Sequence, residues 1–483
     1  MLHPVDFLVL AGYVVVVVSL GWIAHRRQSS TDDFFLGGRR LPWIVVGASI
    51  LATAFSASSL LGGPGEAFHH GLLWLQLQIG DLIAIVIVIW LFVPALRGRN
   101  LTTAYEFLEN RFDVRVRWLA SALFQLQVLF RAGVLVYGPA LALSTLTGLD
   151  LTLTILAVGI IASAYTVMGG LTAVVRTYAL QVGVVIAGLA ACLAVLHGAI
   201  EGGLGEAFRL ARADGRMDLV DPEAAWNSVR SWPGAVFGYG ILALAVFGTN
   251  QQTVQRYLSC RDVSEARRAA WLGWGLGAFI TALTLLVGVA FYGFYQVHSD
   301  RLPADLPADS ILPFFVAEEL PPGLAGLLIA AILAAAMSSL DSALSSLATT
   351  CEVDFLARLR PADDATRLRR ARWLTLVAGV LATAAALLLA GRGTLLDLAV
   401  RVMGWFAGPV LAIFLLALAR RRVPPGLVLG SALGGAGVVL IASIPGPWPD
   451  HLRPGIWSAA LGTVVTLAIA LTGAALGRPS RLD

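Results

Sequence analysis

The chain has 483 residues, of which 58% are hydrophobic and only 13% carry a charge, with a formal net charge of +4. Soluble domains contain roughly 45–50% apolar and roughly 25% charged residues, so this composition excludes an ordinary water-soluble protein. No long polar tract separates one apolar core from another, which indicates a single membrane domain.

Apolar stretches of about 20 residues, the length that crosses the hydrocarbon core of a bilayer, recur along the whole chain. We therefore predict an all-α, polytopic membrane protein with about 13 transmembrane helices. The predicted spans lie near residues 6–25, 43–68, 72–96, 116–146, 151–168, 173–198, 233–257, 269–296, 322–350, 371–391, 395–419, 425–444 and 455–476.

The distribution of arginine predicts the orientation, because short loops rich in arginine stay on the cytoplasmic side. An outside amino terminus places 25 of the 34 basic residues, all of them arginine, on the cytoplasmic side and seven on the other. The remaining two, Arg131 and Arg401, fall within predicted helices. The pattern predicts a multi-pass protein of the cell membrane with a cytoplasmic carboxyl terminus.

The second predicted helix contains small and hydroxyl residues over positions 52–59 and Gly-Gly-Pro-Gly at positions 62–65. Such clusters in mid-span indicate irregular backbone that faces protein or a water-filled cavity, and Pro64 lacks a backbone donor. If a turn opens here, the carbonyl oxygens of Ala52 and Phe55 lose their usual donors and become hard oxygen ligands. Close packing of small residues against another helix is the alternative.

The ninth predicted helix carries oxygen along one face. At 100° per residue, its hydroxyl residues between 338 and 349 and Asp341 fall within an arc of about 160°, and lipid cannot face them. An acid in mid-membrane costs roughly 2.5–3.5 kcal/mol and usually marks an ion or substrate path. Ser338 and Ser339 follow Ala335 by three and four residues, so two hydroxyls and a carbonyl share a face that suits a small hard cation. Serine packing between helices is the alternative.

Six motifs distributed over almost the whole chain together resemble one known family, the sodium/solute symporter family. They are DFFLGG at 33–38, GGPGEAF at 62–68, LTTAYEFLENRF at 101–112, YTVMGGLTAV at 165–174, NQQTVQRYL at 250–258 and the serine-rich helix at 335–350. The segments at 101–112 and 137–143 are most similar to the iodide, monocarboxylate and multivitamin branch.

The resemblance implies one transmembrane domain over residues 1–483, built from two inverted five-helix repeats of the leucine-transporter type. Residues 43–198 would form the first repeat and residues 233–419 the second, with peripheral helices at 6–25 and 425–476. It also implies Na⁺ as the coupling ion. The implied ligands are the oxygens already singled out by residue chemistry, from Ala52, Phe55, Ala335, Ser338 and Ser339.

A second sodium site of some family members has an acid where this chain has Tyr178, so the number of sodium ions stays open, with Asp341 as the residue that could supply charge instead. The helices that line such a transporter also give candidates for substrate contacts. For the aromatic candidates, packing alone is the alternative. The candidates are Ser56, Ser59, Gln76, Tyr137, Asn250, Gln252, Trp405 and Phe406.

Three charged residues fall in mid-span and need a partner or water. They are Asp81, Arg131 and Asp341, which we class as coupling or buried charges. We expect Arg131 to pair with Asp81 or with Asp341. The alternative is that Arg131 faces the carboxylate of an anionic substrate.

The sequence thus predicts a secondary active transporter that carries a small polar organic solute, in particular a monocarboxylate or similar small anion, together with sodium by alternating access. The alternatives are a proton-coupled carrier in which Asp341 titrates, and a sodium-coupled sugar, amino-acid or vitamin carrier. An enzyme is not expected, because the seven histidines form no metal-binding spacing. The expected partners are the solute and the lipid bilayer, with no nucleic acid; the oligomeric state is not predicted.

Overall fold

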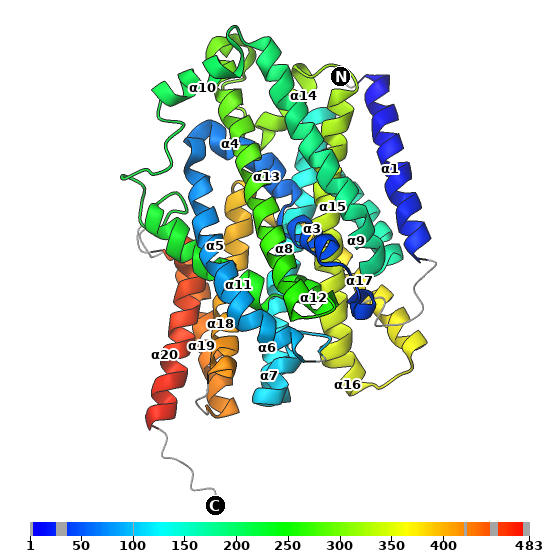
Figure 1. The fold of residues 1–483 in the computed structure, drawn as a ribbon, viewed down its shortest axis with the longest axis vertical. Coiled ribbons are helices and arrows are strands. Elements are labelled where there is room, and N and C mark those ends of the chain that lie inside the picture. The colour runs from blue at the N-terminus through cyan, green and yellow to red at the C-terminus, as the bar shows by residue number, and fades with distance from the viewer. Residues whose placement is uncertain (1–2, 26–35, 100, 420–422, 445–452, 477–483) are drawn as a thin grey trace, which may run out of the picture.

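The computed structural model describes residues 3–25, 36–99, 101–419, 423–444 and 453–476. Helices account for most of this part of the chain and stand side by side along the long axis (Figure 1). A backbone in lipid must satisfy its polar groups internally, and the apolar stretches do so as helices. The all-α membrane architecture is therefore confirmed.

Among the described residues, the first half of the chain contains the helices from α1 to α10. In chain order they are α1 (Pro4–His25), α3 (Trp43–Ala54), α4 (Ala57–His70), α5 (Leu77–Ile87), α6 (Val93–Arg97), α7 (Glu106–Arg111), α8 (Val114–Thr147), α9 (Leu151–Ala199) and α10 (Gly203–Ala213).

The described part of the second half also consists of helices, and it ends with α19 and α20. In chain order the helices are α11 (Tyr239–Thr249), α12 (Gln251–Ser259), α13 (Val263–Val297), α14 (Ile311–Glu318), α15 (Leu324–Thr350), α16 (Ala357–Leu359), α17 (Asp364–Leu389), α18 (Leu395–Leu418), α19 (Pro425–Ser443) and α20 (Ser458–Leu476).

Each of the thirteen predicted spans corresponds to helical structure. Within the described residues, nine segments have the length and apolarity of a membrane span, and four shorter apolar helices of 10–17 residues supply the rest. The spans predicted at 151–168 and 173–198 both lie in α9. Thr166 and Tyr178 of α9 contact Asp341 and Ser342, which are consecutive residues of α15. The two parts of α9 therefore lie beside the same turn of α15.

The backbone opens at the place where the second predicted span was expected to unwind. α3 ends at Ala54, and Phe55 (ψ 120°) and Ser56 (φ −123°, ψ 174°) are extended before α4 begins. Pro64 lies inside α4, eight residues beyond the break, so the proline is not its cause. A second break, at Asn250 (φ −73°, ψ 125°), separates α11 from α12.

Two glycines let the helices next to the centre of the molecule approach closely. A Cβ on Gly80 of α5 would stand 2.8 Å from the carbonyl oxygen of Ala235, and one on Gly240 of α11 would stand 3.4 Å from the Cα of Gly80. Any side chain here would push the helices apart. The contact brings Asp81 and Tyr239, the neighbours of these glycines in sequence, to one place.

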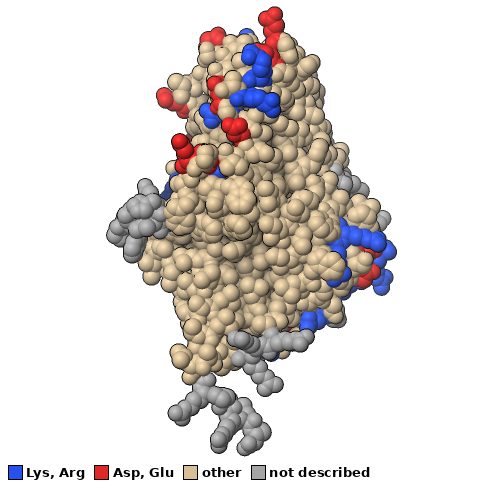
Figure 2. All heavy atoms as spheres, turned by 60° about the vertical axis from the view of Figure 1, so that its left-hand side comes forward, with Lys and Arg blue, Asp and Glu red and all other residues tan. Residues whose placement is uncertain are grey.

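The charged side chains follow the expected pattern of a membrane protein. Figure 2 shows a broad belt without charge across the middle of one face, with charged residues above and below it. The Pro4 end of α1 and the Leu476 end of α20 lie at opposite ends of the molecule (Figure 1), as an odd number of spans requires.

Candidate functional site

The break between α3 and α4 faces the serine-rich side of α15, and oxygens from both meet there. The Ser339 hydroxyl donates to the carbonyl oxygens of Ala52 and Phe55, at 3.1 Å each. The Ser338 hydroxyl donates to the carbonyl oxygen of Ala335 at 3.1 Å. We call these five oxygens the oxygen cluster. All five residues are buried, the most exposed being Phe55 at 9%.

A small cavity adjoins the oxygen cluster. Its volume is about 10 Å³, and Ala52, Phe55, Ala335 and Ser338 are among the residues that line it. That volume is close to the roughly 10–15 Å³ that one water-sized sphere occupies. The room and the donor set, which consists of carbonyl and hydroxyl oxygens, fit a small hard cation.

A buried polar seam continues from the oxygen cluster along α15. The Tyr178 hydroxyl donates to the carbonyl oxygen of Ser338 at 3.1 Å and lies 2.7 Å from the Ser342 hydroxyl. The Arg256 guanidinium donates to the hydroxyls of Ser342 at 2.7 Å and Ser49 at 3.0 Å. A guanidinium thus occupies the hydroxyl-rich surroundings of Tyr178, where the sequence lacks the acid of the second sodium site.

Asp341 of α15 faces α9. One carboxylate oxygen accepts a hydrogen bond of 2.6 Å from Thr166. The other carboxylate oxygen has no partner among the described residues. With 1% of its surface exposed, the carboxyl group is enclosed by α9 and α15.

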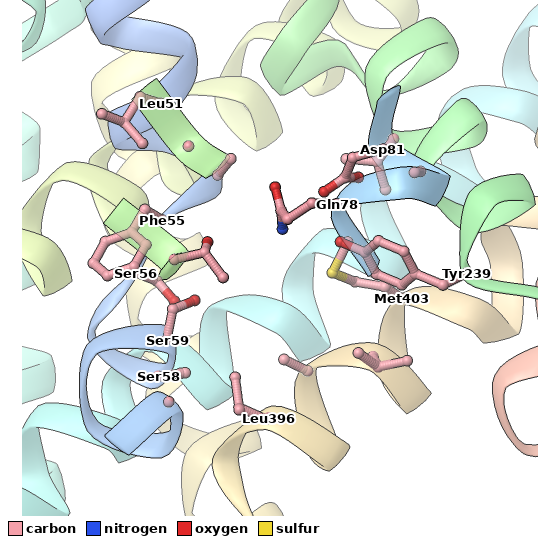
Figure 3. A pocket seen from close by; sticks show the side chains of 18 of the residues that line it. Leu51, Phe55, Ser56, Ser58, Ser59, Gln78, Asp81, Tyr239, Leu396 and Met403 are labelled. Carbon is pink, nitrogen blue, oxygen red and sulfur yellow. The ribbon is translucent and has the colours of Figure 1, made fainter. Parts of the chain in front are cut away.

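A cavity of about 180 Å³ occupies the centre of the molecule; we call it the central cavity. An engineered cavity of about 150 Å³ in another protein holds benzene, so this volume accommodates a small organic molecule. Figure 3 shows its two walls. Phe55 and Ser56 of the α3–α4 break and Ser59 of α4 lie on one side, with Gln78, Asp81 and Tyr239 opposite.

Arg131 of α8 also lines the central cavity and is 7% exposed. Its guanidinium donates to the side-chain oxygen of Gln252 at 3.0 Å and to the carbonyl oxygen of Thr53 at 3.1 Å. Both acceptors are neutral, and no ion pair joins Arg131 to Asp81 or Asp341 among the described residues. The expected pairing of Arg131 with one of these acids is therefore wrong. The positive charge of Arg131 is available to a molecule bound in the cavity.

The eight residues predicted to contact substrate divide between the cavity wall and its surroundings. Ser56 and Ser59 line the central cavity. The Gln252 side chain accepts a hydrogen bond from Arg131. Asn250 caps α12 by accepting a hydrogen bond of 2.9 Å from the Gln252 backbone. These last two residues shape the cavity without lining it.

The other four predicted contacts lie away from the cavity lining. The Gln76 amide donates to the carbonyl oxygens of Leu73 and Arg230, and the Tyr137 hydroxyl accepts a 3.4 Å hydrogen bond from the Gly391 backbone. Trp405 packs edge-on against Phe130 with ring centroids 6.1 Å apart. Phe406 is 6% exposed and belongs to the hydrophobic core.

Gln78 and Tyr239 are among the residues of the cavity wall that were not predicted. Gln78 follows Gln76 by two residues, and the helical turn places Gln78 and Asp81, three residues apart, on one face of α5. That spacing is a signal in the sequence. Tyr239 had no such signal, because its place beside Asp81 depends on the contact between α5 and α11; its hydroxyl is hydrogen-bonded to Asp81.

A model of the Sodium:solute symporter family matches residues 34–434. The chain belongs to this family. Its resemblance to the family at the level of motifs is thus confirmed, and so is Na⁺ as the coupling ion, since the family couples transport to sodium. The family consists of transporters, so this protein is not an enzyme.

The chain is similar to family members with different solutes. It is 31% identical to the sodium/sialic acid symporter SiaT of Proteus mirabilis, over 93% of this chain and 90% of that protein. It is 32% identical to the human sodium/iodide cotransporter, over 89% and 68%, respectively. With human sodium-coupled monocarboxylate transporter 1 the identity is 29%, over 89% and 71%.

Solved structures show the same fold. The substrate-bound, outward-open structure of a Na⁺-coupled sialic acid symporter superposes with a TM-score of 0.88 at 28% identity, over 99% of each chain. Mhp1, a nucleobase-cation-symport-1 family transporter, superposes with a TM-score of 0.55 at 18% identity, over 92% of this chain and 95% of that chain. The leucine-transporter type of fold is confirmed.

Proposed function

We propose that this protein is a sodium-coupled symporter that carries a small organic solute with a carboxylate group across the cell membrane by alternating access. One observation carries the proposal. The α3–α4 break presents carbonyl oxygens to Ser339 on one side, and on the other side its residues Phe55 and Ser56, with Ser59 of α4, line the central cavity.

We assign the sodium ion to the oxygen cluster. Ala52, Phe55 and Ala335 would supply carbonyl oxygens, and Ser338 and Ser339 would supply hydroxyls. Because these residues come from α3, the break and α15, a bound ion links an opened helix to an intact one. Separation of these helices in the inward-open state would weaken the site and release the ion.

Coupling follows from the shared segment. An ion that orders the α3–α4 break also fixes the wall of the central cavity that Ser56 and Ser59 form, so it prepares the solute site. The effect is reciprocal, since each ligand raises the affinity for the other by the same factor. A negative interior adds roughly 2.3 kcal/mol per charge for each 100 mV and drives sodium inward.

The carboxylate is assigned to Arg131. Its guanidinium lines the cavity and donates hydrogen bonds to the neutral oxygens of Gln252 and Thr53. A solute carboxylate would therefore supply the negative charge that pairs with Arg131. Two of the relatives have names that specify acids, sialic acid and monocarboxylate. Their shared chemistry supports a carboxylate for this chain.

A proton-coupled carrier is the second candidate, because one carboxylate oxygen of Asp341 is buried and has no partner among the residues that the structure describes. Uptake driven by a proton gradient in sodium-free buffer would support it. Uptake that requires sodium and persists after Asp341→Asn would instead favour sodium bound at the oxygen cluster.

The sodium assignment is tested by thermal unfolding of the purified protein in NaCl against choline chloride at constant ionic strength. An ion that binds only the folded state raises the midpoint in proportion to ln(1 + [L]/Kd). Ser339→Ala removes the hydroxyl that bridges Ala52 and Phe55, so it should increase the sodium concentration for half the effect several-fold.

Ser346→Ala is the matched control for that experiment. Ser346 is a buried serine of the same helix, and its hydroxyl donates to the carbonyl oxygen of Ala343 within α15. Its sodium titration should follow that of the wild type. If Ser339→Ala and Ser346→Ala respond to sodium alike, the oxygen cluster is not the sodium site.

A further inference from the structure

The central cavity contains two buried formal charges of opposite sign. Asp81 reaches it from α5 and Arg131 from α8, and each is 7% exposed. Tyr239 of α11 also lines the cavity, and its hydroxyl is hydrogen-bonded to Asp81. The cavity therefore has an anionic and a cationic pole.

The two charges do not neutralise each other. Within the described residues no ion pair joins them, and Arg131 donates to the neutral oxygens of Gln252 and Thr53. The Tyr239 hydroxyl is hydrogen-bonded to the Asp81 carboxylate, whose Oδ1 atom has no hydrogen-bond partner in the described part of the chain. Buried charges are normally paired with a charge of opposite sign. Among the described residues, neither Asp81 nor Arg131 has such a partner.

Between the poles the cavity offers neutral polar groups. Gln78 lies on the Asp81 wall, and Ser56 and Ser59 lie opposite (Figure 3). A simple carboxylate anion could satisfy Arg131, yet it would bring a second negative charge into a small cavity with Asp81. A simple cation would meet the reverse problem at Arg131. Only a dipolar solute satisfies both poles at once.

We propose that the solute is a zwitterion of amino-acid type, whose carboxylate binds Arg131 and whose ammonium group binds Asp81. This inference rests on the proposed function and narrows its solute class. Asp81 then acts as a specificity-determining residue, since it attracts the ammonium group and rejects plain anions. The cavity volume of about 180 Å³ suits a molecule of this size.

The test compares small solutes that carry different charged groups, by thermal unfolding and uptake with the full-length protein in sodium. Propionate carries the anionic group alone, propylamine the cationic group alone, and alanine, β-alanine and γ-aminobutyrate carry both at increasing separation. We expect at least one zwitterion to bind about tenfold or more tightly than propionate, as a charged hydrogen bond provides, and propylamine not to bind.

Asp81→Asn removes the anionic pole while an amide can still accept a hydrogen bond from Tyr239. The variant should lose the preference for the zwitterion, with propionate binding unchanged or improved, and its midpoint should still rise with sodium. Asp150→Asn is the control, because Asp150 caps α9 at an exposed position and asparagine caps helices equally well. It should retain the preference.

The failure of this inference differs from the failure of the proposed function. Sodium-dependent binding of propionate at least as tight as that of every zwitterion, or a preference unchanged in Asp81→Asn, would overturn the zwitterion and leave the carboxylate symporter intact. If neither propionate nor any zwitterion bound in sodium, both proposals would be wrong.

Discussion

Arg131 is the residue on which the solute chemistry depends. It is a buried cation whose described hydrogen bonds go to neutral oxygens of Gln252 and Thr53, in the wall of a cavity with room for a small molecule. A charge in mid-membrane is costly and usually functional. The sequence placed Arg131 within a span but paired it with the wrong groups, because spacing along one helix does not reveal which other helices surround it.

Replacing Arg131 with glutamine should abolish uptake and leave the protein folded. Glutamine can donate a hydrogen bond toward the same oxygens but carries no charge for the solute carboxylate, and a hydrogen bond to a charged group contributes about 1.5–3 kcal/mol. Uptake is measured in vesicles with a sodium gradient, and the sodium-induced shift of the unfolding midpoint shows that the fold persists. Normal uptake in Arg131→Gln would remove this residue from the mechanism.

Gln76 and Gln78 show how far residue-scale prediction extends. The sequence pointed to a polar residue at the start of the third span, but the chain enters that span through a 3₁₀ segment, Gly71–Gln76, before α5 begins. With this change in helical pitch, Gln76 faces Leu73 and Arg230, and Gln78 lines the cavity instead. A shift of two residues is within the usual error of boundaries drawn from a sequence.

At the scale of elements, a buried ion-pair cluster ties α7 and α8 to the segment Cys351–Leu356, which directly continues α15. Arg117 of α8 donates to Asp354 at 2.8 Å and to Glu109 of α7 at 2.8 Å. Asp354, which is fully buried, also accepts hydrogen bonds of 2.7 Å from Thr103 and Ser121. The helix that carries the serines of the oxygen cluster is thereby attached to its neighbours at one end.

Asp354→Asn should destabilise the folded protein. Removal of one partner of a buried ion pair costs roughly 3–5 kcal/mol, and the value here should fall toward the lower end because Glu109 remains beside Arg117. The measurement is the thermal midpoint in detergent. Arg358→Gln provides the comparison: Arg358 pairs with Glu109 at 2.6 Å but is 42% exposed, and exposed pairs contribute about 0–1 kcal/mol. Equal midpoints for the two variants would contradict this account.

The two broken helices differ in how visible they are in the sequence. The α3–α4 break was predicted from its small and hydroxyl residues, and the structure opens the backbone at Phe55 and Ser56. The break at Asn250 has no proline beside it, and its local signal is an asparagine that caps α12. An isolated asparagine is too common to predict a break, so the break at Asn250 is seen only in the structure.

At the scale of the whole molecule, the helical segments agree with the hydropathy of the sequence, since length and apolarity alone decide which stretches cross a bilayer. The central cavity could not be predicted in this way. Residues from α3, α4, α5, α8, α11, α13 and α18 line it, and contacts such as that between Gly80 and Gly240 determine which side chains face one another.

The orientation in the membrane is a proposal that the whole molecule makes testable. α7 and α16, whose neighbouring loops are rich in arginine, lie at the same end as Leu476 of α20, and α10 lies at the opposite end (Figure 1). Because arginine-rich loops stay in the cytoplasm, we propose that the α7 end is cytoplasmic and the amino terminus is outside.

Reporter fusions test this orientation. Green fluorescent protein fused after Asp483 should fluoresce, and alkaline phosphatase fused at the same position should be inactive, because the first folds in the cytoplasm and the second needs an oxidising compartment for its disulfides. Phosphatase inserted at Gly215, in the turn after α10, should be active, since that end is expected outside. The reverse pattern at both positions would invert the molecule, and the sodium gradient would then meet the α7 end of the transporter first.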